Sequence, residues 1–338
     1  MSTSRLSLAL DQGLVSVPET GEIVVFRPRA DADLSALPKE RLRIVQGFRP
    51  DHDAWVRRGY TVSTDAPEGF AAALVMVPRA KDEARALIAE ALAPGGPVIV
   101  DGQKTDGIDS LLKEVRRRDA EVSEAYSKAH GKTFRIDAAP GTFADWLRPP
   151  AGPVSGGWVT APGLFSADGP DEASIALGKV LPSDMKGRVA DLGAGWGYLA
   201  FQILEREKVS SCTLIEAEHA AIEAARRNVR DDRAEFVWGD ARSYTPERRF
   251  DAVVSNPPFH TTRAADPALG AAFIDSAARI LAPHGTFWMV ANRHLPYEAP
   301  LRAAFHDVTE LSAPEGSGPF KLFAAKRPSR AQGRDKLS

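Results

Sequence analysis

The chain has 338 residues, of which 43% are hydrophobic and 26% charged, a composition typical of a globular protein with about two domains. It contains no apolar run of about 18 residues, and its first residues lack a signal-peptide core, so we expect a cytoplasmic protein without a membrane span. The formal net charge of −2 excludes a chain-wide attraction to nucleic acid, so any such contact must come from local basic patches.

The N-terminal half alternates short apolar runs with segments of helical spacing. Strands are expected at 23–26, 42–45, 60–62, 73–77 and 97–100, and helices at 82–92 and 109–118. No glycine-rich fingerprint accompanies them. The pattern predicts an α/β domain without a nucleotide-binding loop.

Basic residues gather in three parts of the chain. The candidates for RNA contact are Arg41, Arg43, Arg49, Arg57, Arg58, the run Arg116, Arg117 and Arg118, and the tail from Lys326 to Lys336. We interpret the run at 116–118 first as a solvated helix face, with RNA contact as the alternative. The tail is rich in basic and small polar residues and is predicted to have no fold of its own.

A glycine loop begins the second half of the chain. Residues 188–190 have strand character, D-L-G-A-G-W-G follows at 191–197, and 198–204 has helical spacing. Glycines at such a turn allow close approach of a ligand, and the helix behind it offers unpaired N–H groups. The spacing departs from the dinucleotide pattern G-x-G-x-x-G, so a simple tight turn is equally compatible with this loop alone.

Three further strands are expected, and each is followed by polar residues. The strand at 213–215 ends in Glu216, whose carboxylate can accept hydrogen bonds from both ribose hydroxyls. The strand at 236–238 precedes Asp240, an acceptor for an adenine amino group, and the strand at 250–255 delivers Asn256-Pro-Pro-Phe-His to the rim of the sheet. The single cysteine, Cys212, falls in the second predicted strand of this half and is interpreted as a buried apolar filler, so no internal disulfide is possible.

The sequence resembles the class I S-adenosylmethionine-dependent methyltransferases of the N-P-P-[YF] group, and within them the bacterial small-subunit (16S) rRNA guanine-N2 methyltransferases. The motifs that carry this resemblance are P-G-L-F-S at 162–166, the glycine loop, N-P-P-F-H at 256–260, V-A-N-R-H-L-P-Y at 290–297 and F-K-L-F at 320–323. The resemblance implies an α/β fold of two tandem Rossmann-like methyltransferase domains, the N-terminal one degenerate. It also implies rRNA as partner, within the small ribosomal subunit or an assembly intermediate.

The resemblance assigns roles to individual residues. S-adenosylmethionine would be bound by Asp191, Gly193, Ala194, Gly195, Gly197, Glu216, Ala217, Asp240, Ala241 and Asn256. Catalysis would fall to Asn256, Pro257 and Phe259, and substrate contacts to Phe165, Pro258, Phe259 and His260. Trp196 is expected either to pack on the cofactor or to cap the sheet. His260, His294 and Tyr297 lack metal-ligand spacing, so no metal is expected.

The chemistry explains an Asn-Pro-Pro segment at a strand end. A guanine N2 amine is a poor nucleophile because its lone pair is delocalised into the ring. The Asn256 side-chain oxygen and the Pro257 carbonyl can hold its two hydrogens while the nitrogen becomes tetrahedral, and Phe259 can stack on the base. Proline fixes φ and removes a donor, which keeps such carbonyls rigidly aimed.

The two halves also resemble each other. Residues 70–78 align with 250–258, and 92–100 with 281–289, with Met76 where the second copy has Asn256. We therefore predict an internal duplication in which the first copy has lost the chemistry. The expected domains are 1–147 (degenerate, for RNA docking or support), 148–161 (a Pro- and Gly-rich linker), 162–326 (catalytic) and 327–338 (a flexible basic tail). A helix is expected from about Asp171, and Lys321 in the last strand is expected to face solvent, with RNA as the alternative.

Other functions remain open at this point. The N-P-P motif class also includes enzymes for large-subunit rRNA guanine N2, adenine N6 and protein glutamine. A non-catalytic RNA-binding assembly factor that retains the fold is the alternative from a different class. The presence of Asp191, Glu216, Asp240 and Asn256 argues against the last.

Overall fold

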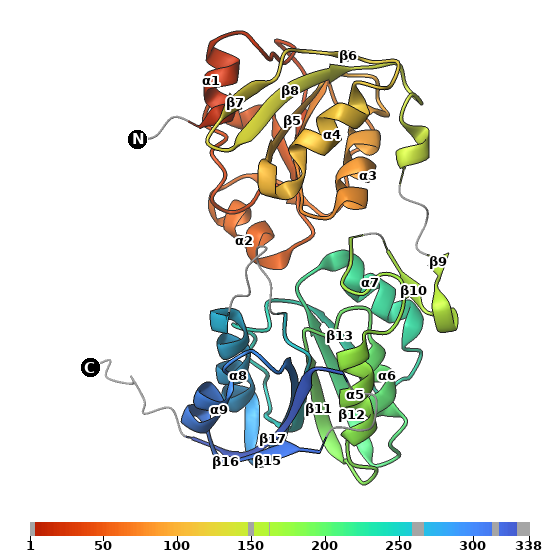
Figure 1. Ribbon diagram of the computed structural model, residues 1–338, viewed down its shortest axis with the longest axis vertical. Helices are drawn as coiled ribbons and strands as arrows, with labels where there is room; N and C mark the ends of the chain where they lie inside the picture. The colour runs from red at the N-terminus through yellow and green to blue at the C-terminus, as the bar shows by residue number, and fades with distance from the viewer. Residues whose placement is uncertain (1–3, 148–151, 162, 259–266, 313–317, 330–338) are drawn as a thin grey trace, which may run out of the picture. The chain divides into compact units, whose positions relative to one another are not determined.

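A computed structural model describes residues 4–147, 152–161, 163–258, 267–312 and 318–329 (Figure 1). The chain separates into two compact units, 1–150 and 151–338, and each is described by itself. Within the described ranges, none of the helices combines the length and apolar character needed to cross a membrane.

The N-terminal unit is built on one mixed sheet. Its parallel strands lie in the order β3 (Thr61–Ser63), β2 (Leu42–Val45), β1 (Ile23–Phe26), β4 (Ala72–Met76) and β5 (Val98–Gln103). Antiparallel β8 (Gly131–Asp137) follows β5 and pairs with β6 (Glu121–Val122) and β7 (Tyr126–Lys128). The expected strands are all present: β1 and β2 have the expected bounds, and the ends of β3, β4 and β5 differ by one to three residues.

Helices cover both faces of this sheet, which is why its central strands are continuously apolar. α3 (Lys81–Leu92) and α4 (Ile108–Val115) pack on one face, and α1 (Arg5–Asp11) and α2 (Arg49–Arg57) lie on the other. Short 3₁₀ turns occur at Lys39–Arg41, Lys104–Asp106 and Ala144–Trp146. The expected helix at 109–118 was too long at its C-terminal end, because Arg116 already caps α4 and Arg118 turns back onto the Val115 carbonyl.

The C-terminal unit carries a second sheet of the same kind. Its order is β13 (Ala234–Trp238), β12 (Val209–Glu216), β11 (Gly187–Leu192), β14 (Phe250–Ser255), β15 (Leu281–Asn292), β17 (Phe320–Pro328) and β16 (Phe305–Leu311). The first five are parallel, and β17 is antiparallel to both of its neighbours. One face is covered by α5 (Glu172–Val180), α6 (Tyr198–Leu204) and α7 (His219–Asn228), the other by α8 (Pro267–Ile280) and α9 (Glu298–Ala304) (Figure 1).

The two sheets share one topology. The order β3-β2-β1-β4-β5 in the first unit corresponds strand for strand to β13-β12-β11-β14-β15 in the second. The aligned segments fall on equivalent strands, β4 with β14 and β5 with β15. The expected fold of two tandem Rossmann-like domains is therefore confirmed. In both units the chain order reverses between the first and fourth strand, and the carboxyl edge at that point is where such sheets bind ligands.

Three segments differ from expectation. Within the range expected as linker, β9 (Gly152–Pro153) pairs with β10 (Val159–Thr160), and a 3₁₀ turn, Ser155–Gly157, joins them. β17 continues through Pro328, so the start of the expected tail is strand. Lys321 was expected to face solvent, and this was wrong: its side chain is 12% exposed and forms an ion pair with Glu298. The roles assigned to the domains remain predictions.

Candidate active site

The glycine loop lies at the carboxyl end of β11, between two parallel neighbours, β12 and β14. Its three glycines have positive φ angles, 72° at Gly193, 55° at Gly195 and 94° at Gly197, which favour glycine. A side-chain carbon added at Gly197 would lie 2.9 Å from Val229, whereas one at Gly195 would meet nothing within 4 Å. The loop is thus closed on its helix side and open at Gly195, as a ligand cradle requires.

Asp191, at the end of β11, is fully buried, and neither of its carboxylate oxygens has a hydrogen-bond partner among the described residues. Burial, aided by the nearby Glu216 charge, raises the pKa of Asp191 to about 7. The Ala200 N–H opposes this shift without reaching hydrogen-bonding geometry. A buried acid without a partner is costly, so it marks a place for a cationic or donating ligand group.

Glu216 ends β12 beside the same loop. Its two carboxylate oxygens accept hydrogen bonds from the backbone N–H of Gly195 and of Glu218, both at 2.8 Å. Burial raises the pKa of Glu216, and these backbone donors oppose the shift. Each oxygen keeps a further lone pair, so the carboxylate can accept from a ligand hydroxyl while staying fixed in place.

Asp240 follows β13 and has a different environment. Both of its carboxylate oxygens accept from the Arg242 guanidinium, with Nη2 at 2.8 Å from Oδ2. The predicted adenine contact from Asp240 would have to use the lone pairs that remain. Ala217 and Ala241 follow Glu216 and Asp240 at the same edge of the sheet. The cofactor roles of these residues remain predictions.

Asn256 leaves β14 with its amide held in one orientation. Its Nδ2 donates to Asp171 Oδ2 and to Ser174 Oγ, both at 2.9 Å. Asp171 is also the N-cap of α5, where Oδ2 accepts from the Ser174 N–H at 3.0 Å. Because both amide hydrogens have acceptors at the start of α5, Oδ1 is the atom of this amide that can accept a further hydrogen bond.

The Asn-Pro-Pro segment lies next to the glycine loop. A side-chain carbon added at Gly193 would lie 3.9 Å from Pro258 Cδ. Pro257 is buried, whereas Pro258 is exposed. The expected stacking residue Phe259 and the expected substrate contact His260 lie outside the described residues. The described part of the motif therefore places Asn256, with its amide held in one orientation, at the rim of the sheet beside the glycine loop.

Trp196 joins the loop to the segment at 165–166. Its side chain is buried, and its indole Nε1 donates to the backbone carbonyls of Phe165 and Ser166, at 3.1 and 3.3 Å. The Phe165 ring itself is 57% exposed. Trp196 thus anchors this segment by its backbone, and the Phe165 side chain remains available as the predicted substrate contact.

Asn228, at the end of α7, holds the same region from the other side. Its Nδ2 donates to the carbonyls of Trp196 and Val159, and its Oδ1 accepts from the Val159 N–H at 2.7 Å. The β10 strand is thereby tied to the glycine loop. Nothing in the sequence indicated this role, since a polar residue in the last turn of a helix is common.

A glycine loop on the first strand, acids after the next two strands and an Asn-Pro-Pro segment on the fourth define the class I methyltransferase arrangement. The sequence model of the methyltransferase small domain matches residues 156–321. Ribosomal RNA small subunit methyltransferase C of Shewanella oneidensis is 30% identical over 264 residues, which cover 74% of this chain and 75% of that protein. Ribosomal RNA large subunit methyltransferase G of Streptomyces avermitilis is 30% identical over 320 residues, 85% and 83% of the two chains.

The fold has a solved counterpart over nearly its whole length. A T. thermophilus 16S rRNA N2 methyltransferase (RsmC), determined with AdoMet and guanosine, superposes with a TM-score of 0.74 and 22% identity, covering 94% of this chain and 91% of that one. The chain belongs to the family of ribosomal RNA methyltransferases that includes the Shewanella and Streptomyces enzymes. The expectation of a methyltransferase is confirmed.

Proposed function

We propose that this protein transfers a methyl group from S-adenosylmethionine to the exocyclic N2 amine of a guanine in 16S rRNA, in the cytoplasm. The observation that carries the proposal is the orientation of Asn256, whose Nδ2 is held by Asp171 and Ser174 at 2.9 Å. An acceptor fixed beside the glycine loop can hold the hydrogens of an amine while its nitrogen becomes tetrahedral. The Shewanella relative, named for the small subunit, supports the choice of rRNA.

The residues present fit the cofactor. When bound, S-adenosylmethionine supplies a methyl group activated by a sulfonium. Asp191, buried and without a partner, would attract the cationic part of the cofactor, and Glu216 would hold its ribose hydroxyls. The open space at Gly195 would let the loop backbone approach it closely.

The catalytic work of the protein is to hold the amine. Asn256 Oδ1 and the Pro257 carbonyl accept its two hydrogens and direct its lone pair at the methyl carbon. Positive charge grows on the amine as the new bond forms, so these oxygens stabilise the transition state more than the ground state. A paired guanine has to leave its stack to reach the pocket, and Phe259 is proposed to receive the base.

The test is mass mapping of N2-methylguanosine in rRNA from cells that lack the protein, complemented with the wild type or with Asn256→Ala. We expect one 16S mark to be missing without the protein, restored by the wild type and absent with Asn256→Ala. Full restoration by Asn256→Ala would contradict the role of the amide.

The large-subunit alternative rests on the Streptomyces relative, which is 30% identical and matches 85% of this chain. The same mapping decides between the two, because a missing mark in the large-subunit rRNA would replace the 16S assignment. Loss of a methyladenosine or of a methylated protein glutamine would identify another amine or amide substrate. Isothermal titration with S-adenosylmethionine tests the remaining alternative, a pure RNA-binding module. Such a module should show no heat of cofactor binding, so a measured heat would exclude it.

A further inference from the structure

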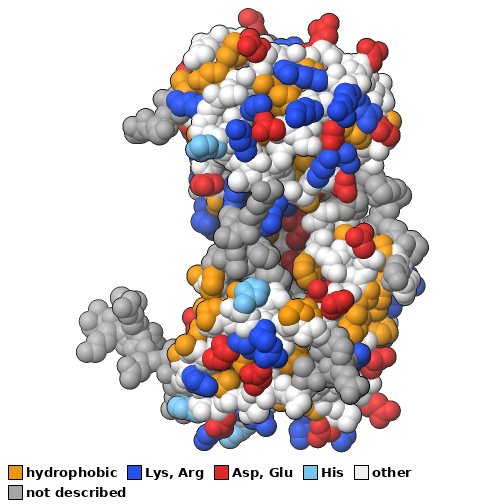
Figure 2. Space-filling view, in the orientation of Figure 1, with side chains coloured by type: hydrophobic (Ala, Val, Ile, Leu, Met, Phe, Trp, Pro, Cys, Tyr) orange, Lys and Arg blue, Asp and Glu red, His pale blue; other side chains and the backbone are white. Residues whose placement is uncertain are grey.

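A concave basic surface lies on the N-terminal unit, between α4 and the β7–β8 hairpin. It encloses about 700 Å³, and the charged side chains that line it are Lys104, Lys113, Arg116, Lys128, Lys132 and Asp109. We call this surface the basic groove. Five basic residues thus face a single carboxylate, in a chain whose net charge is −2. Figure 2 shows Lys and Arg side chains gathered on the face of this unit that α4 and β8 present to the viewer.

Most of the cations in the basic groove have no acid to neutralise them. Asp109 pairs with Lys132 at 2.7 Å, and this pairing, with Lys104 and Lys113 adding to the field, lowers the pKa of Asp109. Among the described residues, Lys104, Lys113, Arg116 and Lys128 form no ion pair, and all four are exposed. Unpaired like charges close together repel each other, which favours an anionic partner.

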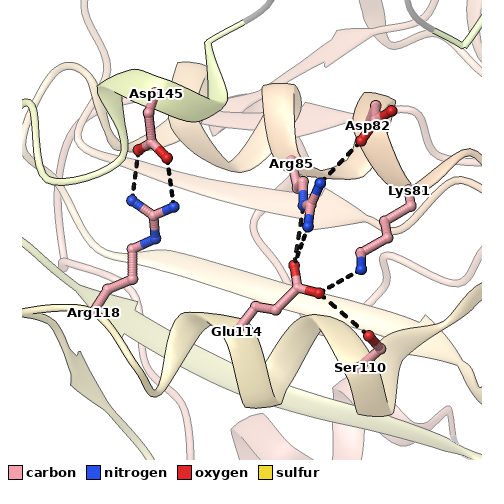
Figure 3. Close-up of polar contacts among 7 residues, drawn as sticks. All are labelled: Lys81, Asp82, Arg85, Ser110, Glu114, Arg118 and Asp145. Atoms are coloured by element: carbon pink, nitrogen blue, oxygen red, sulfur yellow. Dashed lines mark hydrogen bonds and ion pairs between the residues drawn. The ribbon is translucent and has the colours of Figure 1, made fainter.

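The other flank of α4 shows the opposite arrangement (Figure 3). There Glu114 pairs with both Lys81 and Arg85, and Arg118 pairs with Asp145. In each of the three pairs a side-chain nitrogen lies within 2.8 Å of a carboxylate oxygen. Arg118 also lies 4.7 Å from the centre of the Trp146 ring. The run at 116–118 is therefore divided: Arg118 is structural, whereas Arg116 lines the basic groove.

Three of the other basic candidates from the sequence have partners within the fold. Arg41 donates to the carbonyls of Pro18, Glu19 and Gly21. Arg43 pairs with Glu22, and Arg49 pairs with Asp53 at 2.9 Å. These three arginines are engaged within the fold, whereas four of the five cations in the basic groove form no ion pair among the described residues.

The hairpin that carries Lys128 and Lys132 is held by its turn and by a hydrogen bond from Arg5. Its two-residue turn, Ala129 and His130, has φ angles of 48° and 55°, a conformation that non-glycine residues rarely adopt. Arg5 Nη1 donates to the Lys128 carbonyl at 3.0 Å, and Arg5 is itself held by buried Asp101. A rigid support keeps the lysines spread without the entropy loss that a mobile loop would suffer on binding.

We propose that the basic groove docks the phosphate backbone of the RNA substrate. This inference rests on the proposed function in taking RNA as the partner. The shape and charge suit a strand of phosphates, because exposed lysines and arginines around a concave surface can contact several phosphates without reading bases. The groove supplies affinity, and the rim at Asn256 selects the base.

The test compares two triple variants of the full chain in binding to a 16S rRNA transcript at several salt concentrations. The first is Lys113→Gln, Arg116→Gln and Lys128→Gln. The matched control is Lys179→Gln, Lys186→Gln and Lys208→Gln, which removes the same charge from exposed residues of the second unit. Lys186 and Lys208 precede β11 and β12, so they lie at the amino edge of the sheet, opposite the glycine loop.

We expect the groove variant to bind RNA about 10- to 100-fold more weakly and to reduce the slope of log affinity against log salt by about 2 to 3. The control should change both quantities little. Equal losses in both variants, or unchanged RNA affinity in the groove variant, would overturn the proposal; the second result would point to an acidic protein partner.

Failure of this proposal can be told apart from failure of the proposed function. Titration with S-adenosylmethionine and methylation of guanine by the wild type test the catalytic unit alone. If the wild type methylates the RNA and the groove variant binds RNA as well as the wild type does, only the proposal about the basic groove is refuted. If the wild type binds RNA through the groove but transfers no methyl group to guanine, only the proposed function is refuted.

Discussion

At the scale of single residues, the orientation of Asn256 is the feature on which catalysis depends. Its amide donates to Asp171 and Ser174 from elements far apart in sequence. We expect Asn256→Ala to lower kcat by about 10²- to 10³-fold, as loss of a transition-state acceptor does. Asp171→Ala should lower kcat by roughly 10-fold with little change in the KM for cofactor, because it frees the amide to rotate.

Asp171 acts as a positioning residue, and a double-mutant cycle tests this. In the Asn256→Ala background, Asp171→Ala should have no further effect on kcat. It should still cost about 1 kcal/mol of stability in either background, since the N-cap of α5 is lost. Multiplicative losses in kcat would show instead that Asp171 acts independently of the amide.

Asp191 makes a prediction about pH. Its pKa is raised from 3.8 to about 7, so without cofactor the folded state binds an extra proton between these values, and stability falls as pH rises through that window. Asp191→Asn should flatten this dependence and raise the stability of the cofactor-free protein at pH 8 by about 1–3 kcal/mol. It should also weaken cofactor binding. Urea unfolding at pH 5 and pH 8 measures the first effect, and titration calorimetry the second.

The sequence predicted the central residues of the site because their positions follow from chain order. Polar residues after successive parallel strands meet at one edge, which placed Asp191, Glu216 and Asn256 together. Asp171 was expected only at the start of a helix, and Asn228 was assigned no role, because their hydrogen bonds join segments that only the fold brings together. Lys321 was wrongly expected in solvent, since strand alternation cannot distinguish water from an ion pair with Glu298.

At the scale of elements, one ion pair fixes α1 to its sheet. Arg5 donates to Asp101 through Nε at 2.9 Å and through Nη2 at 2.7 Å, and both residues are buried. We expect Arg5→Ala to destabilise the N-terminal unit by about 3–5 kcal/mol, because Asp101 is left as an unpaired buried charge. The half-exposed pair of Arg49 and Asp53 is the control, and Arg49→Ala should cost less than about 1 kcal/mol.

The Arg5 result is measured by chemical denaturation, followed at a signal from the N-terminal unit. A second variant keeps the test decisive if Arg5→Ala does not fold. Arg5→Met combined with Asp101→Leu removes both charges and should recover most of the loss. A loss in the double variant as large as in Arg5→Ala would assign the stability to packing instead.

The elements of the fold were predictable where periodicity is long. Apolar runs of the parallel strands gave β1, β2, β4 and β14 nearly to the residue, because both of their faces are covered. The antiparallel hairpin β7–β8 escaped detection, since Tyr126–Lys128 is short and half exposed. The C-terminal end of α4 was misplaced because three arginines continue a pattern that a helix would tolerate.

At the scale of the molecule, the chain has two units, each with its own cores. We expect two thermal transitions, one for each unit. S-adenosylmethionine at a hundredfold excess over Kd should raise the free energy of unfolding of only one unit, by about 2.7 kcal/mol, and so raise only one transition temperature. Differential scanning calorimetry with and without cofactor measures this. Arg5→Ala should lower the other transition. A single transition shifted by both changes would show that the units unfold together.

The crowding of indoles around the glycine loop has a practical consequence. Trp196 lies 5.4 Å from Trp158 between ring centres, and Trp238 donates to the Ala217 carbonyl beside Glu216. Ultraviolet emission from these rings is quenched or shifted when the polarity around them changes. We therefore expect cofactor binding to change this emission, so that its dissociation constant can be measured without attaching a dye.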